Sequence, residues 1–247
     1  MLNIKKVLSL LVLIIVFFGN LNTVFAEDIF VPDYLNDYGA QIYAGARSNF
    51  SRRSFSGYCG TYVKCQLIAM GILDRNTPLH GNGNKWYGLL KDVDKTSTGY
   101  FAYSEGGADC LARLTEKYGN DLKNIVVSLP IQAHYSARYP GAGHAFIIYE
   151  LKNGIAYYSE SFSFGGHREG SVIAEPVEKL LERYSKRHGS PLGAVMFSKE
   201  DLDLKKAMEL GVLTQNQKED ILAQIENLSD FTYLANEVIY NTQAVLA

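Results

Sequence analysis

The segment 143–162 reads GHAFIIYELKNGIAYYSESF and contains the clearest β-hairpin signal in the chain. Two runs rich in β-branched, aromatic and other apolar residues, 145–151 and 155–162, flank the turn residues Lys152-Asn153-Gly154. Such runs around an Asn-Gly dipeptide are typical of two antiparallel strands joined by a tight turn. The sequence therefore predicts a hairpin over this segment.

The length of the hairpin loop decides which side chains share a face. A two-residue Asn-Gly loop would turn His144 and Glu160 to opposite faces of the sheet. A three-residue loop with Gly154 in the left-handed conformation pairs His144 with Phe162 and leaves His144 and Glu160 on one face, roughly 7–8 Å apart. We expect this second register, because it brings an imidazole and a carboxylate within hydrogen-bond reach.

The other elements of the body are predicted from helical spacing of apolar residues and from glycines that end helices. The spacing predicts helices over 32–47, 59–70, 108–118 and 175–188, a short element over 86–90, and strands over 124–129 and 194–197.

From Ser198 the composition changes to charged and helical, with helices expected over 201–210, 216–227 and 231–245. We therefore expect a main domain over 27–197 and a helical appendage over 198–247.

Residues 1–26 have the pattern of an export signal. Lys5 and Lys6 precede a mostly apolar run over 7–18, and Val24-Phe25-Ala26 offers small residues at the positions that a signal peptidase reads. The run is short for a transmembrane helix, although an uncleaved membrane anchor stays open. We expect a chain that is secreted, periplasmic or associated with the cell wall, without stable membrane insertion once the signal is removed.

Charge argues against nucleic acid as a partner. Loss of Lys5 and Lys6 lowers the number of basic side chains from 24 to 22, against 26 acidic ones, so the net charge changes from −2 to −4. A protein whose main partner is nucleic acid or anionic lipid usually carries a basic surface.

Three cysteines, Cys59, Cys65 and Cys110, are an odd number for an exported chain. At most one disulfide can form within the chain, which leaves at least one thiol. We expect Cys59 to be free, and a bridge between Cys65 and Cys110 stays open.

The segment 57–63, GYCGTYV, places Cys59 at the start of a predicted helix. The free N–H groups and the positive dipole end of a helix stabilise an anion and lower the pKa of a thiol. His144 opens an apolar strand, and Glu160 interrupts the next one, where a buried carboxylate needs a partner. Nucleophile, base and orienting acid in this order favour a cysteine hydrolase.

These residues occur in a pattern that resembles the CHAP family, the cysteine- and histidine-dependent amidohydrolases and peptidases of bacterial peptidoglycan. The motifs are 59–63 (CGTYV), 81–86 (GNGNKW), 143–144 (GH) and 159–160 (SE). The resemblance covers about residues 50–165. It implies a papain-like α+β fold with N-terminal helices packed on an antiparallel β-sheet, and Cys59 as nucleophile, His144 as base and Glu160 as orienting residue.

The chain departs from the family pattern at two points. Phe162 stands where many members carry an asparagine, so a second polar orienting group is absent or moved. The separation of Cys59 and His144 is also wide, which suggests an insertion within 92–140 that shapes the groove.

The resemblance implies an exported cysteine amidase or endopeptidase whose substrate is peptidoglycan or a peptide. Besides the Cys59 N–H, Tyr58 is a candidate oxyanion donor, and Asn82, Asn84 and Trp86 are candidate groove residues, with a core position for Trp86 left open. We expect no cofactor and no metal, because the histidines and cysteines lack metal-ligand spacing.

Two other functions stay open on the sequence alone. One is an exported papain-like toxin that hydrolyses or deamidates a protein target. The other is a secreted binding module that keeps this fold with an inactive site. The sequence does not indicate which amide bond is cut.

Overall fold

The computed structural model describes residues 29–50, 58–92, 96–131, 143–161 and 170–211. The predicted signal over 1–26 and the predicted helices over 216–227 and 231–245 lie outside the described residues. Within the described ranges, no helix is both long and apolar enough to cross a membrane.

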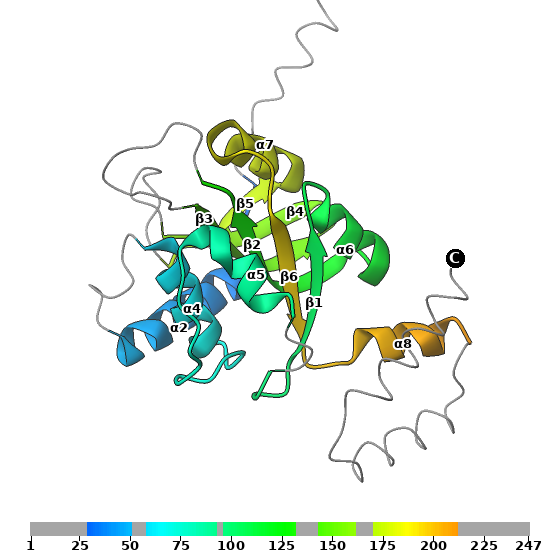
Figure 1. The fold of residues 1–247 in the computed structure, drawn as a ribbon, viewed down its shortest axis with the longest axis horizontal. Helices are drawn as coiled ribbons and strands as arrows, with labels where there is room; N and C mark the ends of the chain where they lie inside the picture. The colour runs from blue at the N-terminus through cyan, green and yellow to red at the C-terminus, as the bar shows by residue number, and fades with distance from the viewer. Residues whose placement is uncertain (1–28, 51–57, 93–95, 132–142, 162–169, 212–247) are drawn as a thin grey trace, which may run out of the picture. The chain divides into compact units, whose positions relative to one another are not determined.

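The fold is α+β, with helices packed on both faces of a six-stranded antiparallel sheet. The strand order is β1-β6-β2-β3-β4-β5, so β6, the last strand in sequence, lies between β1 and β2 (Figure 1). The strands are β1 (Phe101–Gly106), β2 (Asp121–Leu129), β3 (His144–Lys152), β4 (Ile155–Ser159), β5 (Ile173–Pro176) and β6 (Gly193–Ser198).

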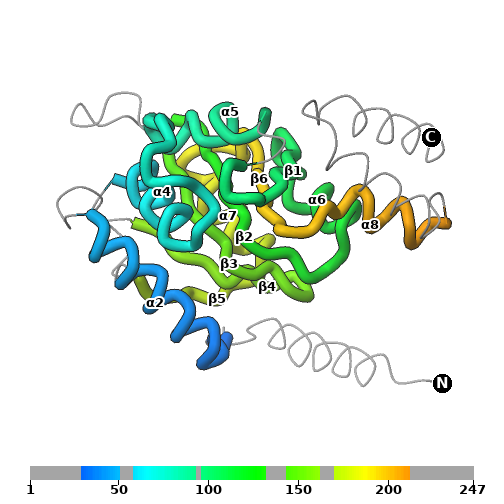
Figure 2. Tube along the Cα trace, turned by 90° about the horizontal axis from the view of Figure 1, so that it is seen from below, coloured from blue at the N-terminus to red at the C-terminus, as the bar shows by residue number. Residues whose placement is uncertain are grey.

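Two layers of helices cover the sheet. On one face lie α2, α4, α5 and the short 3₁₀ helix η1, and α6 and α7 lie on the other (Figure 1). Figure 2 shows α2 running alongside α4, which it contacts. The helices are α2 (Asp33–Asn49), α4 (Cys59–Ala69), η1 (Gly83–Lys85), α5 (Trp86–Leu90), α6 (Cys110–Tyr118), α7 (Val177–His188) and α8 (Leu202–Glu209).

The strands β2, β3 and β6 are buried over most of their length, and successive side chains alternate between the two helical layers. In β2, Val126 packs with the α2–α4 layer and Val127 with the α6–α7 layer. In β3, Ile147 and Ile148 divide in the same way. Alternation is the consequence of the two-residue period of a strand, and burial on both sides explains the apolar runs 125–127 in β2 and 145–149 in β3.

The loop between β3 and β4 is shorter than the sequence analysis predicted. Lys152 pairs with Ile155, so the loop has two residues, and both Asn153 and Gly154 have positive φ angles, 49° and 77°. This conformation suits the right-handed twist of the strands. The expected three-residue loop is wrong.

A register shift in β3 restores the predicted relation between the two strands. The register shifts by one residue between Ile148 and Glu150, so beyond it Ile148 pairs with Tyr158 and Ile147 with Ser159. An extra residue in one strand is a β-bulge, and it reverses the facing of every later side chain. The register beyond the bulge is the one that we expected, but Tyr149 supplies the extra residue instead of the loop.

The core confirms the reversal at Tyr149. Phe146 and Ile148 belong to the cluster on the α6–α7 side, as does Leu151 beyond the bulge, although Leu151 has the opposite parity in sequence. On the other side, Glu150 accepts hydrogen bonds from the phenol of Tyr34 in α2, at 3.2 and 3.0 Å to its two carboxylate oxygens. The bulge therefore places His144 on the α6–α7 side of β3.

The expected insertion within 92–140 stays a prediction, and residues 132–140 lie outside the described residues. The described part of 92–140 supplies the strand β1 at one edge of the sheet, the helix α6, and β2, which is hydrogen-bonded to both β3 and β6. β1 was not predicted, and neither was β5, where the predicted helix over 175–188 begins two residues late, at Val177.

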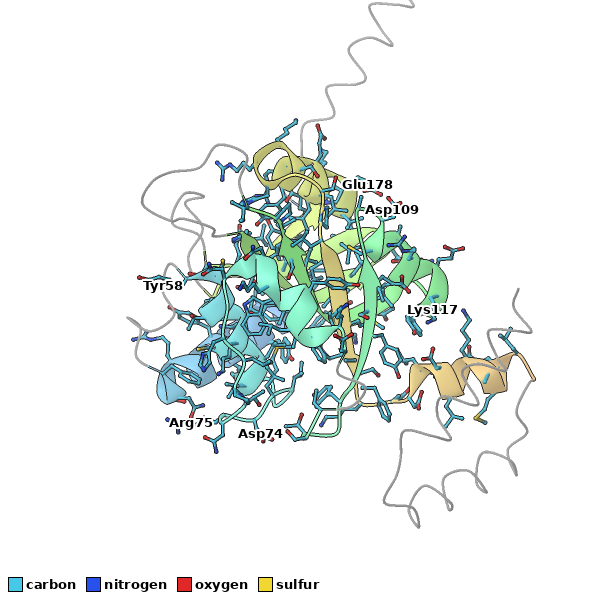
Figure 3. All side chains as sticks on the ribbon, in the orientation of Figure 1. Tyr58, Asp74, Arg75, Asp109, Lys117 and Glu178 are labelled. Carbon is cyan, nitrogen blue, oxygen red and sulfur yellow. The ribbon has the colours of Figure 1, made fainter. Side chains whose placement is uncertain are left out.

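The first helix of the predicted appendage packs on the body. Ala207 of α8 is fully buried, and Leu202 packs against the core that α6 shares with the sheet. The phenol of Tyr118 donates to Asp203 at 3.0 Å, and Lys206 donates to the backbone oxygen of Lys117 at 2.8 Å. In Figure 3, Lys117 marks the part of α6 that faces α8.

We expect that a chain ending at Lys199 stays folded and keeps a reactive Cys59. Loss of α8 should lower the free energy of unfolding by about 2–3 kcal/mol, because buried apolar surface and several hydrogen bonds are lost. α8 contacts α6 and β1, whereas Cys59 lies at the start of α4. Denaturant unfolding and hydrolysis of a small soluble muropeptide measure the two effects. A folded truncated protein without that activity would mean that the tail completes the site, rather than governing targeting or access.

Candidate active site

Cys59 is the first residue of α4 and is half-buried. Its sulfur lies 3.7 Å from the backbone oxygen of Gly143 and accepts hydrogen bonds from the backbone N–H groups of Ala145 and Gly60. Burial alone raises the pKa of the thiol, but the hydrogen bond and charge of His144, together with the two N–H groups, bring the pKa of Cys59 below its usual range. The environment of this sulfur therefore favours a thiolate.

His144 begins β3 and joins the two other predicted site residues. It is 2% exposed, and its Nε2 lies 2.7 Å from Oε2 of Glu160. This leaves Nδ1 for the hydrogen bond with Cys59. Burial alone lowers the pKa of His144, but its hydrogen bonds to Cys59 and Glu160 raise the pKa to about 9. An imidazolium is stable between a thiolate and a carboxylate.

Glu160 follows the last residue of β4 and is buried, with 6% of its surface exposed. It accepts from His144 and from the phenol of Tyr184, both at Oε2. Burial alone raises its pKa, and the hydrogen bond and charge of His144, followed by the bond from Tyr184, lower the pKa of Glu160 below the usual range of a carboxyl. The structure thus brings together Cys59, His144 and Glu160, the predicted nucleophile, base and orienting acid.

Helix α7 supplies two side chains at this site that the sequence analysis missed. Tyr184 and His188 lie one helical turn apart and their rings lie 5.3 and 5.6 Å from the ring of His144. His188 approaches the backbone oxygen of Pro130 at 3.2 Å through Nδ1. Burial and the neighbouring charge of His144 lower the pKa of His188 to about 4, so it is neutral beside an imidazolium. The sequence signal that could have found them is the spacing of four residues between Tyr184 and His188, which places both on one face of a helix.

Two glycines allow η1 to press against the start of β3. A Cβ on Gly83 would lie 2.4 Å from the carbonyl carbon of His144, and a Cβ on Gly143 would lie 2.4 Å from the Cβ of Asn84. Such distances exclude any larger side chain without movement of the backbone. The GNGN segment, residues 81–84, therefore packs directly against the backbone of His144. The sequence analysis predicted only groove residues here and did not predict this packing.

The candidate groove residues have different positions. Asn82 is exposed at the start of η1, and Asn84 is half-buried beside Gly143. Trp86 is 1% exposed and packs in the core, with its Nε1 2.5 Å from where a Cβ on Gly60 would lie. Trp86 is therefore a core residue and not a groove residue, which is the alternative left open by the sequence. The contact with the indole also explains why glycine follows Cys59.

Tyr58 immediately precedes Cys59 and is 58% exposed. Its side chain points outward from the start of α4 (Figure 3). Its role as an oxyanion donor stays a prediction. The Cys59 N–H belongs to the first turn of α4, whose N–H groups have no partner within the helix.

The other cysteines are buried and free. Cys65 packs with Tyr62 and Ala46, and Cys110, the first residue of α6, belongs to a different core cluster. The possible bridge between them does not form. Burial raises the pKa of each of these two thiols to about 11. Among the described residues, no group of three or more His, Cys, Asp or Glu side chains could hold a metal ion.

Comparison with known proteins adds no relative. No family model, no curated protein and no solved structure matches this chain. The likeness to the CHAP family therefore rests on the motifs quoted above, and the chemistry of the site is inferred from its own geometry.

We expect Glu160→Gln to lower the rate of hydrolysis by about 10²–10⁴-fold, less than replacement of Cys59. The amide keeps the shape of the side chain but removes the charge that stabilises the imidazolium of His144 across the 2.7 Å contact. Steady-state kinetics on a muropeptide measure the loss. An unchanged rate would assign the orienting role to another residue, such as Ser161 or Glu169.

Gly83→Ala should lower kcat/KM by about 10–100-fold, because displacement of a catalytic group by about 1 Å has an effect of this size. The added Cβ would meet backbone atoms of His144 and Ala145 at 2.4 and 2.6 Å, so either η1 or the start of β3 must move. Gly88→Ala is the matched control, since a Cβ at this helical position meets nothing within 4 Å. Equal activity in the two variants would contradict close packing behind His144.

Proposed function

We propose that the chain is an exported cysteine amidase or endopeptidase that hydrolyses amide bonds in bacterial peptidoglycan. The observation that carries this proposal is the continuous hydrogen-bonded chain from Cys59 through His144 to Glu160, with the sulfur at the start of a helix. A nucleophile, a base and a group that orients the base are the requirements for covalent hydrolysis of an amide.

The first half of the reaction forms a thioester. The Cys59 thiolate attacks the amide carbon, and the negative charge moves to the carbonyl oxygen, which the Cys59 N–H stabilises at the open turn of α4. His144 then gives its proton to the leaving nitrogen, and the carbon–nitrogen bond breaks. The amine leaves and the acyl group stays on the sulfur.

The second half releases the acyl group. Neutral His144 accepts a proton from a water molecule, and the water oxygen attacks the thioester carbon. Collapse of this second intermediate breaks the carbon–sulfur bond and returns the thiolate next to the imidazolium. Glu160 keeps its charge throughout, because its role is to hold the ring and stabilise the positive charge.

The choice of substrate rests on the resemblance and on the export signal. The CHAP-like motifs favour peptidoglycan stem peptides or cross-links, and the signal pattern over 1–26 would deliver the enzyme to the wall. The packing of α2 and α4 on one face of the antiparallel sheet and the cysteine at the start of α4 support a papain-like arrangement. The segment 198–247 stays the proposed appendage, and α8 lies in its described part.

Digestion of purified sacculi tests the proposal. The full mature chain should release soluble muropeptides whose masses identify the cut bond, and prior treatment with a thiol alkylating reagent should stop the release. A panel of folded proteins forms the second arm of the experiment. Cleavage or deamidation of these proteins with intact sacculi would favour the toxin, and no hydrolysis of either would favour a binding module.

A further inference from the structure

Glu160 has a second hydrogen-bond partner, Tyr184, which lies outside all of the CHAP-like motifs. The phenol of Tyr184 donates to Oε2, the same oxygen that accepts from His144. Tyr184 is 2% exposed and comes from α7, on the face of the sheet opposite to the helix that carries Cys59. Through Glu160 and His144, this bond links α7 to Cys59 of α4.

The ring of Tyr184 is fixed by its neighbours. It stacks on Phe146 of β3 with ring centres 4.9 Å apart and an angle of 13° between the planes, and the guanidinium carbon of Arg183 lies 4.5 Å from the centre of the Tyr184 ring. Arg183 itself is held by Glu175 at 3.0 Å and by Tyr158 at 2.6 Å. A ring packed in this way holds its hydroxyl in one place, which is the requirement for an orienting donor.

Without Tyr184, the buried carboxylate would have fewer donors to hold it. Glu160 follows the last residue of β4, and both observed donors meet one of its oxygens. A buried ionised carboxylate needs several hydrogen bonds to stay charged. Because Phe162 stands where many CHAP members carry asparagine, the chain also lacks that orienting group at its usual position.

We propose that Tyr184 is a positioning residue that holds the Glu160 carboxylate, ionised and correctly turned, against His144. The proposal rests on the proposed function, since it assigns a role at the same site. Tyr184 acts through Glu160 and His144 on the readiness of Cys59 to ionise.

The charged and titratable groups around Glu160 define what a pH experiment reports. They come from four elements: Cys59 of α4, His144 of β3, Tyr158 of β4, and Arg183, Tyr184 and His188 of α7. His188 is neutral above acid pH, Arg183 stays charged, and the pKa of Glu160 lies below the usual range of a carboxyl, so the titration that alkylation reports belongs to Cys59 and His144.

The experiment measures the rate of alkylation of Cys59 by iodoacetamide as a function of pH in the full mature chain. Cys65 and Cys110 are fully buried, and a Cys59→Ala chain gives the background. In Tyr184→Phe, the pH at which the thiolate appears should rise by about half to one unit, because the Glu160 carboxylate loses the donor that turns it toward His144 and then stabilises the imidazolium less. Tyr118→Phe is the matched control, since this helical tyrosine donates to the carboxylate of Asp203 at 3.0 Å.

A double variant separates positioning from general packing. In a Glu160→Gln background, Tyr184→Phe should add little to the shift, because the charge through which the phenol acts is already gone. Replacement of Tyr184 by 3-fluorotyrosine keeps the size of the ring nearly unchanged and makes the phenol a stronger donor. The pH at which the Cys59 thiolate appears should then fall.

The outcomes distinguish the two proposals. If the wild-type thiol titrates like an ordinary cysteine, the ion pair is absent and the proposed function fails together with this inference. If the wild type has a low thiolate transition and Tyr184→Phe leaves it unchanged, the role of Tyr184 is overturned while the proposed function stands. A shift of equal size in the Glu160→Gln background would also overturn it.

Discussion

We expect Cys59→Ala to abolish hydrolysis, with a loss on the order of 10⁴–10⁶-fold, because the two other thiols, Cys65 and Cys110, are fully buried and their pKa values are raised to about 11. The change removes a half-buried sulfur at the start of α4 and no packed core atom, so the fold and the melting temperature should stay close to those of the wild type. Kinetics on a muropeptide, with circular dichroism as a check on folding, measure both quantities.

Cys110→Ala is the control for this prediction. Cys110 is a fully buried thiol whose pKa burial raises to about 11. Its replacement should lower the free energy of unfolding by about 1 kcal/mol and leave the activity of the folded protein unchanged. If Cys110→Ala were inactive while Cys59→Ala kept its activity, the nucleophile would be misassigned.

His144→Ala is the second large effect, with an expected loss on the order of 10³–10⁵-fold. The variant lacks the base for the thioester step and the acid for the leaving nitrogen. It also removes the partner that lowers the pKa of Cys59, so alkylation of the thiol should shift to higher pH. Near-wild-type turnover would exclude His144 from the mechanism.

The pH profile of the wild type follows from the same pair. The folded-state pKa of His144 is raised to about 9, so the imidazolium is fully present below its unfolded value and is lost as the pH rises through about 9. The pKa of Cys59 lies below the usual range of a thiol, so its thiolate forms at a lower pH than that of an ordinary cysteine. Turnover should therefore be high in the window between these two transitions and fall on the alkaline side, where His144 can no longer protonate the leaving nitrogen.

Much of the local structure was predictable because it depends on residues close together in sequence. The apolar spacing that ends at Gly71 predicted α4 to within a residue, and Lys152-Asn153-Gly154 correctly marked the hairpin. Cys59 at a helix start and His144 at a strand start follow from the same local patterns. The strand β1 was missed because Phe101–Gly106 carries charged and small residues whose burial depends on its position beside β6.

The hairpin shows where local reasoning stops. Asn153-Gly154 is a two-residue turn by its own chemistry, and by itself it would turn His144 and Glu160 to opposite faces. The bulge at Tyr149 reverses that facing, and no dipeptide in the strand marks it. It is set by tertiary packing, with Tyr149 directed to the α2–α4 layer and Glu150 held by Tyr34.

By itself, the sequence determined the helices and strands that carry Cys59, His144 and Glu160, because periodicity and turn chemistry act over a few residues. Only the tertiary structure decided that β6 lies between β1 and β2, that Trp86 is buried behind Gly60, and that Tyr184 reaches Glu160. These relations join segments far apart in the chain. Their free energy comes from packing and hydrogen bonds across the two layers, which no local pattern of residues encodes.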